Sequence, residues 1–226
     1  MMETQFLIDA KVESESIPSL ISLAGEGVLS PKYAKVIFGK KGSELYTEIL
    51  EIQKEEGEVL EDLRKYSENY WGRIEEKYFE YMEKLTYQKL DPKKRVYFSP
   101  IIKIGIADVR GRENVFIGTY FNKEDLNYII PHESTPLHYT DIASKIKLHE
   151  ATRSPLMEGV DHMIIFKSPI TKILNMKADY KKLNFVRSNP EFMKELEDEW
   201  DNRKNFESFL KKAIEIQNKF KNVKIC

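Results

Sequence analysis

The sequence is poor in the features that mark secreted, membrane-spanning and nucleic-acid-binding proteins. It contains one cysteine, Cys226, so it cannot form an internal disulfide and gives no sign of an oxidising compartment. No apolar run approaches the ~20 residues that a membrane-spanning helix needs. The 36 basic residues are balanced by 37 acidic ones, for a net charge of -1. With this balance the chain has no excess of positive charge that would favour binding to nucleic acid or to an anionic membrane.

The first ten residues also lack the basic and apolar blocks of a secretory signal peptide, because Glu3 and Asp9 stand among the apolar positions. We therefore expect a cytoplasmic protein with no membrane partner. We expect no nucleic-acid partner either, since short basic runs such as Lys93–Arg95 are balanced by nearby acidic residues.

The chain contains enough hydrophobic residues to form a sizeable core. Of its 226 residues, 41% are hydrophobic and 12% aromatic, which is an ordinary globular composition. This length suits one large domain or two small subdomains. At Lys89–Lys93 the pattern changes from helical periodicity to strand-like runs. The change predicts a mainly helical subdomain at 1–92 and a second subdomain at 93–226, unless the two form one continuous domain.

The first of these subdomains is predicted to consist mainly of helices. A strand is expected at Phe6–Val12 and a short helix at Ser16–Leu23. Apolar residues recur at helical spacing in two longer stretches, Ser43–Glu56 and Glu58–Lys89. We interpret the aromatic stripe of the second stretch as a core-facing surface. Amphipathic helices of this kind could also bind a protein partner.

The second subdomain is predicted to combine strands with helices. Its strand-like runs are Arg95–Phe98, Ile101–Ile106 and Asn114–Tyr120, with a hairpin turn at Arg110–Asn114. With the N-terminal helices, these elements predict an α+β fold in which a helical half packs on a small antiparallel sheet. Further helices are expected at Leu126–Ile130, Asp141–Leu148, Pro155–Ile165, Pro190–Trp200 and Asn205–Lys221.

Histidines stand beside acidic residues in a segment that suits a metal site. His132, Glu133 and His138 follow a predicted helix entry, where Asn122 and Asp125 have the spacing of an N-cap. Imidazoles and carboxylates together bind divalent metals. A catalytic zinc site needs three protein ligands, an open position for water and a nearby carboxylate base. The sequence therefore predicts Zn²⁺ as a cofactor at this segment.

In the order of its elements from about Arg95 to Ile165, the chain resembles the zincin metallopeptidases whose third zinc ligand is a glutamate. In such enzymes a strand pair precedes a helix with a His-Glu-x-x-His motif, and a following helix brings the third ligand. The resemblance implies that His132 is a zinc ligand, Glu133 the general base and Glu158 the third ligand. It also implies that an edge strand near Asn114–Gly118 aligns a peptide substrate.

The motif departs from the family pattern at its second histidine. Pro136 occupies that position, and His138 lies about a third of a turn from His132 on an ideal helix. Pro131 and Pro136 also disfavour a straight helix. Two outcomes are open. Either the helix unwinds so that His138 or His149 enters the coordination sphere, or the protein keeps the zincin shape without the metal.

A second ligand set is available further along the chain. Glu158 and His162 are four residues apart and share a face of an intact helix. With His132 they supply two imidazoles and one carboxylate, which suit catalytic zinc. The predicted ligands are therefore His132, His138 and Glu158, with His162 and His149 in reserve.

These residues lead to two functional hypotheses. The first is a zinc-dependent metallopeptidase in which Glu133 activates water for attack on a peptide or protein substrate, and Tyr120 or Tyr139 donates a hydrogen bond to the oxyanion. The second is a catalytically inactive zincin-fold protein that acts as an interaction module, which the two prolines favour. Other chemistries lack support, because Ser134 has no Gly-x-Ser-x-Gly setting and no glycine-rich stretch matches a P-loop.

Overall fold

The structure is a computed structural model that describes residues 4–89, 94–108, 114–145, 155–176, 179–220 and 223. Helices dominate, and a four-stranded sheet accompanies them, which confirms the predicted α+β fold. The predicted hairpin turn at Arg110–Asn114 lies almost entirely outside the described residues. Within the described ranges, no helix combines the length and the apolar character that crossing a bilayer requires.

The chain forms two compact units whose segments alternate along the sequence. Unit 1 contains residues 1–73 and 92–133, and unit 2 contains residues 74–91 and 134–226. The subdomains 1–92 and 93–226, or one continuous domain, stay a prediction from the sequence.

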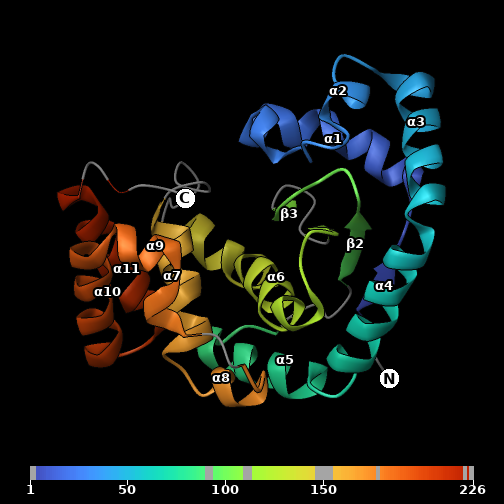
Figure 1. The fold of residues 1–226 in the computed structure, drawn as a ribbon. Coiled ribbons are helices and arrows are strands. Elements are labelled where there is room, and N and C mark those ends of the chain that lie inside the picture. The colour runs from blue at the N-terminus through green and yellow to red at the C-terminus, as the bar shows by residue number, and fades with distance from the viewer. Residues whose placement is uncertain are drawn as a thin grey trace. The chain divides into compact units, whose positions relative to one another are not determined.

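Unit 1 carries the sheet and the N-terminal helices (Figure 1). It begins with β1 (Gln5–Leu7), α1 (Ala10–Ala24), η1 (Glu26–Val28), α2 (Ala34–Ile37), α3 (Gly42–Glu55) and α4 (Gly57–Trp71). It continues with β2 (Arg95–Ser99), β3 (Gly105–Asp108), β4 (Asn114–Gly118) and the first part of α6 (Lys123–Lys145).

The N-terminal strand is shorter than predicted, because a helix cap follows it closely. The side chain of Asp9 accepts hydrogen bonds from the backbone N–H groups of Lys11, at 2.9 Å, and of Val12, at 3.1 Å. These bonds satisfy donors that a helix leaves unpaired at its start. The strand prediction is therefore wrong in its second half, and the helix predicted at Ser16–Leu23 begins earlier, at Ala10.

The sheet of unit 1 is mixed, with strand order β1-β2-β4-β3. β2 pairs in parallel with both β1 and β4, and β3 pairs antiparallel with β4. The antiparallel prediction therefore holds for β3 and β4 alone, since the helices from α1 to α5 (Glu75–Thr86) separate β1 from β2 along the chain and β2 returns in the same direction. β4 lies between β2 and β3, so the predicted edge strand Asn114–Gly118 is interior. Among the described strands, β3 occupies that edge instead.

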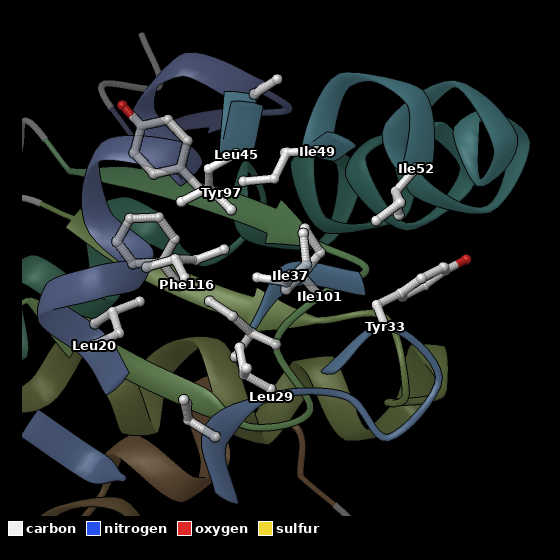
Figure 2. Close-up of a cluster of buried hydrophobic side chains, with 14 residues drawn as sticks. Leu20, Leu29, Tyr33, Ile37, Leu45, Ile49, Ile52, Tyr97, Ile101 and Phe116 are labelled. Atoms are coloured by element: carbon white, nitrogen blue, oxygen red, sulfur yellow. The ribbon is translucent and has the colours of Figure 1, made fainter. Parts of the chain in front are cut away.

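A hydrophobic core joins this sheet to α1, α2 and α3, as Figure 2 shows. Tyr97 of β2 and Phe116 of β4 are opposite one another in the strand register, and their rings stack with centroids 5.3 Å apart. Full burial of one large apolar side chain contributes about 1.5–3 kcal/mol, so a core of this size fixes the sheet against its helices. The other labelled members are Leu20, Leu29, Tyr33, Ile37, Leu45, Ile49, Ile52 and Ile101.

The helix predicted over Glu58–Lys89 is divided into α4 and α5 (Glu75–Thr86). The break falls just after Trp71, where Gly72, a weak helix former, ends α4. The interpretation of the aromatic stripe as core is confirmed, because its main members are buried. They are Leu60, Leu63, Tyr70, Trp71, Ile74, Tyr78 and Met82.

The regular elements that the structure describes in unit 2 are all helices. It contains α5, the second part of α6, α7 (Pro155–Phe166), α8 (Ile170–Ile173), η3 (Tyr180–Lys182), α9 (Asn184–Ser188), α10 (Pro190–Asn202) and α11 (Phe206–Lys219). The helices α7, α10 and α11 pack against one another (Figure 1). Gly159 permits the close approach of α7 to α10, since a Cβ there would meet the side chains of Leu196 and Phe192. The helices predicted at Pro155–Ile165 and Pro190–Trp200 are confirmed, and so is the helix predicted at Asn205–Lys221 as far as Lys219.

Candidate metal centre

The helix α6 carries the predicted His-Glu motif and begins as the sequence predicts. The backbone N–H of Asp125 donates to the Asn122 side chain at 2.9 Å, and the Asn122 N–H donates to the Asp125 carboxylate at 3.3 Å. This reciprocal pair caps the helix. From there α6 runs to Lys145 without interruption, so Pro131 and Pro136 do not unwind it. Each proline removes one backbone donor, but the helix continues past both.

His132 and Glu133 lie in the unit 1 part of α6. His132 is buried, and its Nδ1 is 3.3 Å from the hydroxyl of Tyr128, one turn earlier. An Nδ1–H held in this way would fix the tautomer in which Nε2 is the metal-binding nitrogen. The Nε2 atom lies 4.0 Å from the Glu133 carboxylate.

Glu133 is placed against the backbone of β3. A Cβ added to Gly105 would lie 2.7 Å from Cγ of Glu133 and 2.8 Å from Cγ2 of Ile129. The missing side chain of Gly105 therefore gives Glu133 the room to lie beside the edge strand. The strand that flanks the predicted base is thus β3, and the β4 segment named in the sequence prediction is one strand further in.

His138, a predicted ligand, lies in an aromatic setting in unit 2. Its ring centroid is 5.4 Å from that of Tyr78 and 5.3 Å from that of Phe79, and the residue is 3% exposed. A ring packed in this way gains from aromatic contact. Its role as a ligand stays a prediction, and His149, the other alternative, is outside the described residues.

Glu158 and His162 come together on one face of α7. The Nε2 atom of His162 lies 3.4 Å from Oε1 of Glu158. Two ligands of a tetrahedral zinc ion with bonds of about 2.0–2.1 Å are ~3.3 Å apart, so the observed separation matches that of neighbouring ligands. The imidazole is almost fully buried, whereas the carboxylate side chain is 34% exposed. Water could therefore reach the pair from the Glu158 side.

Aromatic rings orient the imidazole of His162. Its centroid lies 5.5 Å from that of Phe185, 6.0 Å from Phe166 and 6.4 Å from Tyr180. Rings packed on several sides restrict the rotation of an imidazole, so its Nε2 stays directed at Glu158.

A buried hydrogen bond links Tyr139 of α6 to Asp161 of α7. The Tyr139 hydroxyl donates to Oδ1 of Asp161 at 2.7 Å. Burial, with the negative charges of Asp161 and Glu158, holds the pKa of Tyr139 well above 10. The Tyr139 hydroxyl, which the sequence analysis predicts to donate to an oxyanion, thus donates to Asp161. Sequence reasoning missed Asp161, although an acidic residue within the apolar stretch of α7 is a signal for a buried polar contact.

The remaining oxyanion candidate, Tyr120, lies in unit 1 and is 52% exposed. Its hydroxyl forms a hydrogen bond with the side chain of Ser30. The structure therefore places Tyr120 in unit 1 and Tyr139 in unit 2.

A second buried polar cluster in unit 1 was also missed. Glu13 of α1 accepts hydrogen bonds from the Ser99 hydroxyl and, at 2.6 Å, from the side-chain amide of Gln53. Burial outweighs these bonds and raises the pKa of Glu13 to about 7. All three side chains are buried, which makes the cluster a structural element of the core rather than an open catalytic site.

The chain was compared with models of known protein families, with curated proteins and with solved structures, and none of these matches it. The resemblance to glutamate-type zincins accordingly stays a prediction from its motif.

Proposed function

We propose that this protein is a zinc-dependent metallopeptidase that uses Glu158 and His162 of α7 as two of its three metal ligands. The observation that carries the proposal is their geometry. The two ligand atoms are 3.4 Å apart on one helix face, with the imidazole buried and the carboxylate partly open to solvent. Neutral imidazole and carboxylate are ligand types that catalytic zinc sites use.

His132 is proposed as the third ligand. With Glu158 and His162 it would supply the two imidazoles and one carboxylate that the sequence predicts as a ligand set, which leaves a fourth position of a tetrahedral ion for water. The contact of its Nδ1 with Tyr128 favours metal binding through Nε2. His162 thus takes the place of the predicted ligand His138, whose ring packs against Tyr78 and Phe79.

Glu133 is proposed as the general base. When bound, zinc would supply an acidified water and polarise a peptide carbonyl. The Glu133 carboxylate would accept the proton of that water and pass it to the leaving amine. An extended peptide could add to the β3 edge, where Gly105 brings the sheet backbone beside Glu133.

Zinc content and peptide hydrolysis test the proposal together. Protein is purified without a metal-affinity tag, and its zinc is measured for the wild type, H162A, E158Q and E133Q. We expect one zinc per chain in the wild type and in E133Q, and a loss of zinc in the other two variants. Glu191→Gln, an exposed carboxylate on α10, is the control and should keep the metal.

Hydrolysis of a mixed peptide library then separates binding from catalysis. We expect E133Q to lose roughly 10²–10⁴-fold in rate, the range typical of general-base removal. Unchanged hydrolysis in E133Q would refute the assignment of the base. A wild-type protein that holds no zinc and is equally stable without it would favour the non-catalytic interaction module.

A further inference from the structure

We infer that Tyr139 and Asp161 form a positioning pair that sets the metal-binding face of α7, an inference that rests on the proposed function. The Tyr139 hydroxyl touches α7 at two places. It donates to Asp161 at 2.7 Å and lies 3.7 Å from Sδ of Met157. Met157 and Asp161 flank Glu158 in the sequence. The Tyr139 hydroxyl therefore contacts the segment of α7 that carries the proposed ligands.

The bond between Tyr139 and Asp161 is buried at both ends. Tyr139 is 0% exposed and Asp161 is 3% exposed, so water does not compete freely for the carboxylate. A hydrogen bond to a charged acceptor in such a setting is about twice as strong as a neutral one. Turning α7 by one residue would rotate Asp161 by ~100° and break the bond.

Helix periodicity links this bond to the proposed ligands. Asp161 lies three residues after Glu158 and directly before His162, so its setting fixes the directions of both side chains. On α6, Tyr139 lies seven residues after His132, and seven residues turn ~700°, within about 20° of two full turns. His132 and Tyr139 therefore share one stripe of α6. Within unit 2, the bond from Tyr139 holds the face of α7 that carries Glu158 and His162.

A second buried contact holds the same stripe. Thr135 lies one turn before Tyr139 on α6, and its hydroxyl is 3.1 Å from the hydroxyl of Tyr78 on α5. Both residues are 0% exposed. The stripe is therefore anchored to α5 as well as to α7, which limits the rotation of α6 about its own axis.

Zinc affinity measures the role of the pair directly. The variant Y139F keeps the ring and removes only the hydroxyl, and we expect its zinc Kd to rise about 10–100-fold, the usual effect of losing an outer-shell partner. The affinity is measured by competition with a chromophoric zinc chelator on the folded protein, with folding checked by circular dichroism. The matched control is Y70F, which removes the hydroxyl that Tyr70 donates to the Asn127 carbonyl at 3.2 Å in unit 1.

The controls decide between positioning and simple stabilisation. Y70F should lose stability and keep the wild-type zinc Kd. If Y139F also keeps the wild-type Kd, the pair is merely structural and the inference is wrong. D161N replaces the charged acceptor of Tyr139 by a neutral one and should raise the Kd by an intermediate factor of about 3–10. It keeps the test decisive should Y139F not fold, because a wild-type Kd in D161N would contradict the inference.

Failure of the proposed function would look different. A protein that binds zinc and responds to Y139F, but hydrolyses no peptide, would retain the positioning pair and lose the peptidase assignment. A wild-type protein with no affinity for zinc would overturn both.

Discussion

Replacing Glu13 by glutamine should make the protein more stable at neutral and alkaline pH. Glu13 is buried at the contact of α1 with Ser99 and Gln53, and burial raises the pKa of its carboxyl from 4.5 to about 7. The folded state therefore favours the neutral acid, whereas the unfolded chain ionises near pH 4.5. Glutamine is neutral at every pH and has nearly the same shape.

The expected magnitude follows from the two pKa values. Below pH 4.5 the carboxyl is neutral in both states and costs nothing. As pH rises to about 7 the unfolded state loses its proton first, so the wild type loses stability, and above pH 7 the loss levels off. The difference between a pKa of about 7 and one of 4.5, at 1.36 kcal/mol per pH unit, amounts to ~3.4 kcal/mol. Hydrogen bonds that glutamine makes less well than a carboxylate reduce the net gain by about 1 kcal/mol.

Urea unfolding of the wild type and E13Q at several values between pH 4.5 and 8.5 measures this difference. Other titrating groups act equally in both proteins, so the difference in unfolding free energy isolates Glu13. It should move in favour of E13Q by about 2–3 kcal/mol across that range. Glu15→Gln, an exposed change on the same helix, should leave the pH dependence unaltered. A difference that stays flat with pH, or that moves toward the wild type, would refute a buried carboxyl with a raised pKa.

Two further predictions concern the scaffold. Gly118→Ala should destabilise the protein by about 1–3 kcal/mol in urea unfolding, because its Cβ would clash with the backbone carbonyl of Ile102. Gly27→Ala, where a Cβ meets nothing, should be close to neutral, and an equal loss in both variants would contradict the explanation. Asn205→Ala should lower stability by about 1 kcal/mol, since the Asn205 side chain accepts from the Ser208 N–H at 2.8 Å and caps α11. An unchanged thermal midpoint in this variant would show that the cap contributes nothing.

The proposed metal site moves one ligand relative to the family motif. In that motif two histidines one turn apart lie on the helix that carries the base. Here Pro136 holds the second position, and α7 supplies a pair with the same spacing, Glu158 and His162. A spacing of four residues places two side chains on the same face of any helix. Glu158 and His162 of α7 therefore have the same local arrangement as the two histidines of the motif.

Local signals in the sequence determined much of the fold. The sequence predicted helices at the positions of α3, α7, α10 and α11, and the spacing of Asn122 and Asp125 predicted where α6 begins. These features depend on residues within a few turns of one another, so the sequence carries them without knowledge of the tertiary structure. The pairing of Glu158 with His162 is of the same kind.

The tertiary structure decided the rest. Strand order depends on contacts between distant segments, and this is why β4 is interior and β3 is at the edge. The burial of Glu13 among Ser99 and Gln53, and of Asp161 against Tyr139, is likewise set by elements that meet only in the folded chain. A carboxylate looks the same in the sequence whether it faces water or a hydroxyl in the core. Only the packing around it determines its pKa and its partner.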